Sequence, residues 1–313
     1  MTNQSTAKQN FKVIGKRVPR PDGVAKVTGE ATFGADTQVS GMLHARVLRS
    51  PHAHARIMSI DVSGALALKG VKAVVTSDDF ESDLPDKMQD VADNCLARDK
   101  VLYDGHAVAA VAAVSKVIAK KALGLIHVEY EILPHVTDVD AAMLMDAPVL
   151  HRGRAQPSVP AGYSENLTNY IEFGHGDLEA GFDAAEITME RTYKTEAVHQ
   201  GHIEPNACLA TLAADGRGDL WVCTQGQYMV RANCCAILGL EVGKLRVTAS
   251  EIGGGFGGKT TTFIEPTALA LSRKAGKPVK LVLNREEVFR ATGPTVSSSI
   301  DVKIGMTNDG RIT

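Results

Sequence analysis

Runs of apolar residues in the first half of the chain predict short strands and one helix. The β-branched run at 71–76 predicts a strand, and a helix predicted at 116–124 lies between strands predicted at 107–112 and 126–130. Proline and small residues up to Pro148 then end the pattern. This half is therefore expected to form an α/β unit.

The second half alternates apolar and polar positions over a longer series of elements. The pattern predicts a strand and a turn within 169–177, a helix at 228–238 that Gly239 caps, and a helix at 263–275. Further strands are predicted at 187–195, 209–213, 220–225, 245–249, 279–283 and 299–304. The chain is expected to stop inside a domain, because its last turn leads toward a strand that Thr313 does not reach.

Length and breaks in the pattern divide the chain. A chain of 313 residues exceeds one typical core and indicates two domains or three. The first 17 residues carry no sustained apolar period, and a polar stretch with Gly153 and Pro157 is typical of a linker. The expected division is a flexible lead-in at 1–17, a domain at 18–136, a linker at 137–165 and a domain at 166–313.

Composition and charge exclude several classes of protein. Hydrophobic residues make up 44% and charged residues 22%, which is ordinary for a soluble globular protein. The formal net charge of -2 and the lack of a basic run give no reason to expect nucleic acid as a partner. The polar first ten residues lack the apolar core of a secretory signal, and no stretch is long enough to span a bilayer. We therefore expect a cytoplasmic location without membrane attachment.

The cysteines do not form a recognisable site. The sequence has five, too few and too irregularly spaced for a disulfide framework, a zinc site or an iron–sulfur site. They are interpreted as reduced, mostly buried thiols. A redox centre made by this chain alone is therefore not expected to be a cysteine-bound cluster.

A glycine-rich stretch at 251–260 is the strongest candidate for a binding site. Five of the six residues at 253–258 are glycine, and the stretch lies between a predicted strand and a predicted helix. Backbone amides at such a junction, together with the helix N-terminus, suit an anion. The stretch matches both G-x-G-x-x-G and G-x-x-x-x-G-K-T, and a tight turn that needs glycine only for packing is a third alternative.

Each nucleotide-binding alternative lacks the acidic residue that its motif requires. A phosphate-binding loop needs an acidic residue at the end of a hydrophobic strand to hold magnesium, but the strand at 279–283 is followed by Asn284 and Arg285. A dinucleotide fold needs an uninterrupted first strand and an acidic residue about 20 positions later. Here Ser250 interrupts the approach, and the next strand-closing acid, Glu286, is too distant.

Motifs in both halves together resemble one known family. The glycine stretch at 253–259 follows Thr224-Gln225 and His202-Ile203-Glu204-Pro205, and the first half contributes the motifs at 15–31, 50–53 and 104–109. In this order the motifs resemble the large subunit of the xanthine dehydrogenase/aldehyde oxidase family of molybdenum hydroxylases, from about residue 14 to 313. The resemblance implies an α+β fold, with an a/b hammerhead domain followed by the first part of a molybdopterin-binding domain.

The resemblance also implies a cofactor and the residues around it. The family's cofactor is molybdopterin with molybdenum, whose metal needs no protein side chain as a ligand. Gln225 would donate a hydrogen bond to a molybdenum oxo group, and Phe256 would also lie near the metal. The remaining cofactor-binding positions would be Gly254, Gly255 and Gly257, and the pocket would be lined by His199, His202 and Glu204. A hydrogen-bonded turn before Pro205 is an equal alternative role for Glu204.

Two departures from the family pattern bear on the substrate. Xanthine-specific members carry a carboxylate directly after the loop lysine, where this chain has Thr260. They also carry Arg-His-Pro where this chain has a segment beginning Gly293-Pro294. Xanthine is therefore not the expected substrate. We expect an aldehyde, an aromatic acid thioester or an N-heterocycle instead.

The resemblance further implies parts that this sequence does not contain. In the family, the general-base glutamate and most contacts to the cofactor tail lie in a later region, and electrons pass to subunits that carry [2Fe-2S] clusters and FAD. We therefore expect a truncated large subunit or one piece of a split one, active only with the later region or with a second molybdopterin-binding subunit. We expect the cofactor in the cytosine dinucleotide form that is common in bacterial members. A cofactor-free binding or assembly module of the same fold is the competing alternative.

Overall fold

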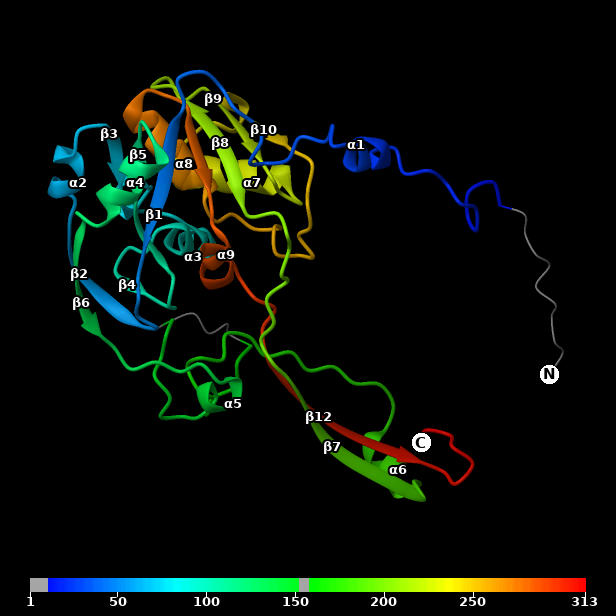
Figure 1. Cartoon of the computed structure of the whole chain (residues 1–313). Helices are drawn as coiled ribbons and strands as arrows, with labels where there is room; N and C mark the ends of the chain where they lie inside the picture. Colours follow the sequence, from blue (N-terminus) through cyan, green and yellow to red (C-terminus); the bar gives the residue numbers. More distant parts are fainter. Residues whose placement is uncertain (1–10, 152–157) are drawn as a thin grey trace.

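A computed structural model describes residues 11–151 and 158–313 (Figure 1). Residues 1–10 of the predicted lead-in and 152–157 of the predicted linker lie outside the described residues. Strands from both predicted domains join in one seven-stranded sheet. Its order is β10 (Leu245–Ala249), β9 (Gly218–Val222), β8 (Ala207–Leu212), β11 (Val279–Val282), β1 (Leu43–Arg49), β5 (Ala107–Ala113) and β3 (Val71–Val75).

The sheet is mixed, and its central pairing connects the two halves of the chain. Strands β1 and β11 run parallel, with Leu43 opposite Val279, while β5 and β8 pair antiparallel on either side of them. Every residue of β5 is buried, as expected for a central strand with both faces covered. The predicted first and second domains are therefore not separated at the level of the sheet.

Helices cover both faces of the sheet (Figure 1). On one face α8 (Glu265–Ala275) packs against β8, β3 and β11, and α7 (Gln227–Leu238) and α3 (Asp86–Cys95) extend the same main core. On the other face α4 (Lys116–Leu123) and α2 (Ser63–Ala67) enclose a smaller core with β5 and β3. The first eight residues of α8 are all buried, so this helix lies at the centre of the molecule.

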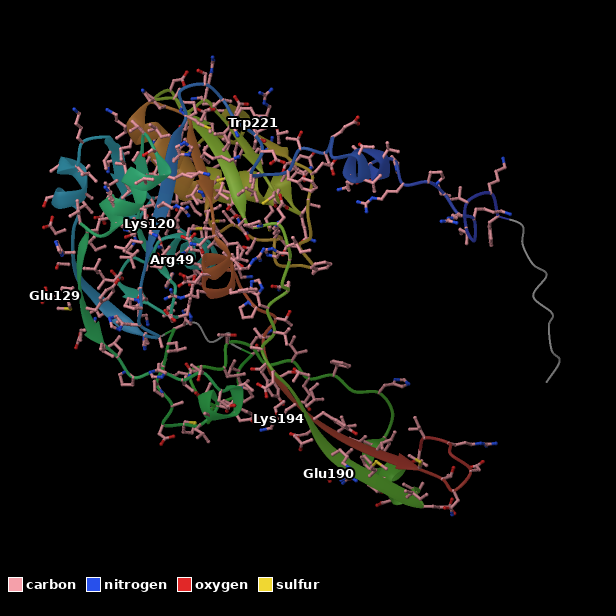
Figure 2. All side chains as sticks on the ribbon, viewed as in Figure 1. Arg49, Lys120, Glu129, Glu190, Lys194 and Trp221 are labelled. Carbon is pink, nitrogen blue, oxygen red and sulfur yellow. The ribbon has the colours of Figure 1, made fainter. Side chains whose placement is uncertain are left out.

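Two smaller sheets lie beside the main one. The first contains β4 (Lys100–Val101), β2 (Ala55–Asp61) and β6 (His127–Ile132). The second sheet is a two-stranded ribbon of β7 (Ile187–Thr195) and β12 (Ser298–Met306). This ribbon projects from the main body; in Figure 2 the labelled residues Glu190 and Lys194 mark β7. The remaining helices are α1 (Gly23–Thr28), α5 (Val139–Ala142), α6 (Leu178–Asp183) and α9 (Arg285–Ala291), with 3-10 turns η1 (Ser77–Asp79) and η2 (Val242–Lys244).

Most strongly patterned elements agree with the predictions. Strand β7 has the predicted bounds, α4 and α7 differ from theirs by one residue at one end, and Gly239 caps α7 with a φ of 64°. All five cysteines are buried and unpaired. The strand predicted within 169–177 is wrong: the segment pairs with no described strand, and Ile171 and Phe173 are exposed. In the described part, no helix has the length and apolar character needed to cross a bilayer.

The buried His106 should make stability fall in weak acid. Its Nδ1 accepts a hydrogen bond from the Leu102 N–H, its Nε2 lies 2.8 Å from the Asp93 carbonyl, and burial lowers its pKa to about 4. Between pH 6.5 and 4 the unfolded chain takes up a proton that the folded chain does not, which removes about 3 kcal/mol of stability. Urea unfolding at several pH values should show this loss in the native protein and a smaller one in His106→Gln. Equal pH dependence in the two proteins would contradict it.

Candidate functional site

The glycine loop, residues 250–264, connects β10 to α8 in an unusual backbone conformation. Gly254 has a φ of +100° and Gly257 a φ of +88°, values that side chains with a Cβ rarely adopt. Phe256 has a φ of +51° and is the only non-glycine residue with positive φ in the described ranges. Its side chain is 75% exposed. The loop therefore holds an aromatic ring on the surface at the cost of backbone strain, an arrangement typical of functional sites.

Gln225, in the turn between β9 and α7, is fixed against this loop by its side-chain oxygen. That oxygen accepts hydrogen bonds from the backbone N–H of Gly257 at 3.0 Å and of Lys259 at 3.3 Å. The backbone N–H of Gln225 donates to the Lys259 carbonyl at 3.0 Å. A Cβ on Gly255 would lie 2.5 Å from the Gln225 oxygen, so only glycine permits this approach. Because the side-chain oxygen of Gln225 faces the loop, its side-chain NH₂ group points away from these bonds and is free to donate to a ligand. Among the described residues this NH₂ group has no partner.

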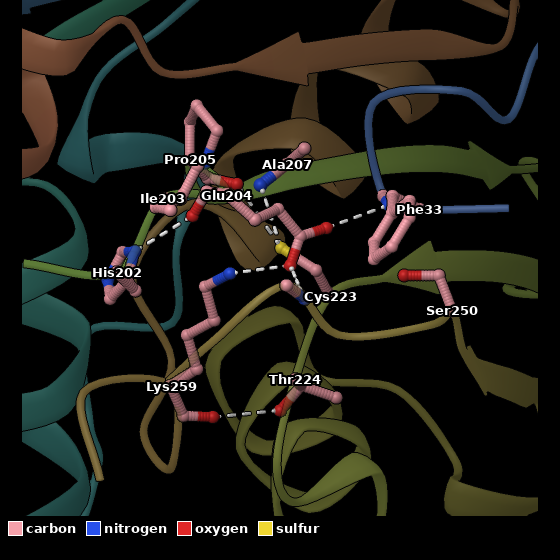
Figure 3. A network of polar contacts seen from close by, with 12 residues as sticks. Phe33, His202, Ile203, Glu204, Pro205, Ala207, Cys223, Thr224, Ser250 and Lys259 are labelled. Atoms are coloured by element: carbon pink, nitrogen blue, oxygen red, sulfur yellow. Dashed lines mark hydrogen bonds and ion pairs between the residues drawn. The ribbon is translucent and has the colours of Figure 1, made fainter. Parts of the chain in front are cut away.

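Glu204 lies beneath the loop at the centre of a buried polar network (Figure 3). One carboxylate oxygen accepts from the Gly34 N–H at 3.0 Å, and the other from the Gly253 N–H at 2.9 Å and from Lys259 Nζ at 2.7 Å. The side chains of Lys259 and Glu204 are 1% and 7% exposed. Both oxygens are occupied within the protein, which favours a structural role for Glu204 over contact with a substrate, although the bonds reach distant segments and not a local turn before Pro205.

The same contacts contradict the phosphate-binding alternative. A phosphate-binding lysine must be free to reach its ligand, whereas Lys259 is buried and paired with Glu204. The expected helix N-terminus is also not available, because α8 begins at Glu265, whose buried carboxylate accepts from the Phe263 and Ile264 N–H groups. This helix end is thus occupied by a carboxylate of the chain itself, so the prediction that it would receive an anionic ligand is wrong.

His202 packs under the loop with one ring nitrogen unused. Its Nδ1 donates to the Glu204 carbonyl at 2.8 Å, and a Cβ on Gly254 would lie 3.2 Å from the His202 Cβ. Its Nε2 is buried and has no partner in the described part. Burial lowers the pKa of His202, which keeps the ring neutral.

His199 is bound on both sides of its ring. Its Nδ1 accepts from the Gly201 N–H at 3.0 Å, and its Nε2 donates to the Thr292 hydroxyl at 2.9 Å. The ring packs edge-on against Phe289 with ring centres 5.1 Å apart, and it lies 5.6 Å from the His202 ring. The structure thus brings His199 and His202 together beside the loop, with both rings held by protein contacts.

Sequence patterns did not reveal the long-range partners of these residues. The contact from Glu204 to Gly34 and the buried pair with Lys259 join segments that no local period connects. Gly34 lies outside the first-half motifs at 15–31, 50–53 and 104–109, so the sequence carried no signal for this contact. Within 11–151 and 158–313, no group of three or more His, Cys, Asp or Glu side chains is placed to hold a metal ion.

Two family models match different parts of the chain. Residues 28–134 match the family "Aldehyde oxidase and xanthine dehydrogenase, a/b hammerhead domain", and residues 162–313 match the "Molybdopterin cofactor-binding domain". The chain is 33% identical over 308 residues to the nicotinate dehydrogenase large molybdopterin subunit of Eubacterium barkeri, covering 97% of this chain and 69% of that subunit. It is 33% identical over 305 residues to the xanthine dehydrogenase molybdenum-binding subunit of Escherichia coli O157:H7, covering 94% of this chain and 39% of that one.

A solved structure shows the same fold. The reconstituted CO dehydrogenase from Oligotropha carboxidovorans superposes with a TM-score of 0.80 at 31% identity, over 95% of this chain and 38% of that one. The chain thus spans 38% to 39% of the length of several relatives. It belongs to the xanthine dehydrogenase/aldehyde oxidase family of molybdenum hydroxylases, and it corresponds to the hammerhead domain and part of the molybdopterin-binding domain of their large subunits.

Proposed function

We propose that the glycine loop and Gln225 bind molybdopterin with its molybdenum, within the large subunit of an oxidoreductase that hydroxylates carbon or runs the reverse reduction. The observation that carries this proposal is the NH₂ group of Gln225, which has no partner among the described residues and is held beside the loop backbone by two hydrogen bonds to the side-chain oxygen. The residues fit the group, because Gly254 and Gly255 let the loop approach His202 and Gln225 closely, while the open space beside Gly257 and the exposed ring of Phe256 leave a surface free for a ligand.

Each residue would have a separate task. The bound cofactor supplies hydroxylation with oxygen from water and takes up the electrons. Gln225 would donate a hydrogen bond from its NH₂ group to an oxo group of the cofactor, and the amides of Gly254 to Gly257 would lie against it. Phe256 would exclude water from that face. His199 and His202 would form the neutral wall of the pocket, since burial lowers the pKa of both rings.

The substrate is proposed to be an aldehyde, an N-heterocycle or an aromatic acid thioester. Thr260, at the position where the family resemblance implies a carboxylate in xanthine-specific members, donates its hydroxyl to the Gly257 carbonyl at 2.7 Å. This position therefore offers no charge to orient a purine. The relatives' names cover nicotinate, xanthine and carbon monoxide as substrates, so family membership alone does not select among them.

The proposed assembly contains further components. We propose an iron–sulfur subunit with [2Fe-2S] clusters and an FAD subunit as electron acceptors, in the cytoplasm, and the cytosine dinucleotide form of the cofactor. The general base would come from a region outside this sequence, in the same polypeptide or in a second molybdopterin-binding subunit. One relative is itself named a large molybdopterin subunit, which supports including that second subunit in the search for partners.

The proposal is tested on the native complex, purified from its source through this chain. Metal analysis should find stoichiometric molybdenum, and chromatography of the released cofactor should find a pterin with a cytosine nucleotide. Iron and flavin should purify with it. A chain that carries neither molybdenum nor pterin, with no redox subunits, would instead support a cofactor-free binding or assembly module.

A further inference from the structure

A segment near the N-terminus, residues 26–37, lies across the base of the glycine loop; we call it the N-terminal strap. Lys26 forms an ion pair with Glu251 at 2.6 Å, and the Glu251 N–H donates to the Thr32 carbonyl at 3.1 Å. Phe33 forms an isolated β-bridge with Glu251. By sequence the strap belongs mostly to the hammerhead match, yet these contacts attach it to the molybdopterin-binding part.

The strap is also fixed from the central sheet. Lys280, a buried residue of β11, donates from its Nζ to the Gly34 carbonyl at 2.6 Å and to the Thr37 carbonyl at 2.8 Å. A Cβ on Gly34 would lie 2.9 Å from the Cys223 Cβ and 3.2 Å from the Ala207 carbonyl oxygen. The strap therefore packs directly on the ends of β8 and β9, with no room for a larger residue at position 34.

Glu204 joins this strap to the glycine loop. Its two oxygens face opposite ways, one toward the Gly34 N–H and the other toward Gly253 and Lys259 (Figure 3). A Cβ on Gly253 would lie 2.7 Å from the Glu204 Cβ, so the loop is in close contact with the side chain as well as bonded to it. A buried carboxylate with two oxygens satisfied in fixed directions allows little independent movement of either segment.

Lys259 carries this constraint to Gln225. Its side chain is held by Glu204, its backbone N–H donates to the Gln225 side-chain oxygen, and its carbonyl accepts from the Gln225 N–H. The Thr224 hydroxyl donates to the same carbonyl at 3.1 Å. The direction of the Gln225 NH₂ group is thus set through Lys259 by the network under the loop.

We propose that Glu204 is a positioning residue that couples the N-terminal strap to the glycine loop through Gly34, Gly253 and Lys259, and thereby fixes Gln225. The strap is part of the cofactor-binding site, although it touches the loop only from beneath. This inference rests on the proposed function for its consequence at the cofactor, but the coupling between strap and loop is a property of the protein itself.

The test is hydrogen exchange of the Glu204→Gln variant in the native complex. The substitution keeps the side-chain size but places an NH₂ group against N–H donors, so amides in peptides at 30–37 and 251–262 should both exchange about tenfold faster. Glu287→Gln is the matched control, since its side chain is also mostly buried, accepts the Asn284 N–H and pairs with Arg46 and Arg49, outside the strap and the glycine loop. It should lower stability without faster exchange in either peptide. Similar exchange in the two variants would overturn the proposal.

A second variant, Lys280→Met, releases the strap without touching the glycine loop. Faster exchange should appear in the 251–262 peptide as well as in the strap, and acceleration confined to the strap would refute the coupling. In the molybdenum-loaded complex, the electron paramagnetic resonance spectrum of the reduced metal should change in Glu204→Gln and not in Glu287→Gln. A native complex without molybdenum would refute the proposed function, while the exchange results would still decide the coupling.

Discussion

Gln225→Ala is expected to lower turnover of the assembled enzyme about 100- to 1000-fold, the effect of removing one preorganised hydrogen-bond donor from a reacting centre. The fold should be retained, because the side chain is exposed and the exposed Gly257 N–H that it leaves can bind water. Turnover is measured in the purified complex with the best substrate from a panel of aldehydes, N-heterocycles and aromatic acid thioesters, and the unfolding temperature is measured on the same samples.

Gln225→Glu tests the role of the side-chain NH₂ donor separately from that of the side-chain oxygen. A carboxylate keeps an oxygen for the Gly257 and Lys259 N–H groups but removes the NH₂ group, so turnover should fall about as far as in the alanine variant. Gln227→Ala, two residues later in the first turn of α7, is the control and should leave turnover unchanged. Normal turnover in both position-225 variants would show that Gln225 does not act on the cofactor.

The sequence predicted best those elements whose local pattern of residues indicates whether they are buried and where they end. Strand β5 is a continuous apolar run because both of its faces are covered, and α7 has a glycine at its end. Strand β1 was not predicted as a strand, although Leu43, Ala45 and Val47 are buried and alternate with less buried neighbours, which is the period of a strand; alanine at the middle position weakens that apolar signal. The wrong strand at 169–177 had a suitable pattern but pairs with no described strand, which no local period can indicate.

In the candidate site, too, local sequence predicted some residues and not others. Glycine density located the loop, and the family motif located Gln225, because both are properties of short stretches. The partners of Glu204 could not be predicted, since Gly34 is 170 residues away in the sequence and a lone buried carboxylate has no local signature. The lysine after the loop glycines was misleading for the same reason. Its motif matches a phosphate-binding loop, and only its burial beside Glu204 shows a different role.

Lys259→Met is expected to destabilise the protein by about 3 to 5 kcal/mol, because it leaves the Glu204 carboxylate buried without its opposite charge. Methionine fills a similar volume, so the cost comes from the unpaired charge and not from a cavity. Urea unfolding of the native complex and of the variant measures the difference. A phosphate-binding lysine would behave in the opposite way, since its loss would remove nucleotide binding and leave stability without nucleotide unchanged.

The double variant Glu204→Gln with Lys259→Met tests whether charge is the cause. It removes both charges, so it should recover more than half of the stability that Lys259→Met loses, although the Gly34 and Gly253 N–H groups keep only one good acceptor. Magnesium–ATP should stabilise neither the native protein nor either variant. Additive losses in the double variant would mean that the two side chains act independently, and a nucleotide-dependent rise in the unfolding midpoint of the native protein alone would return Lys259 to a phosphate-binding role.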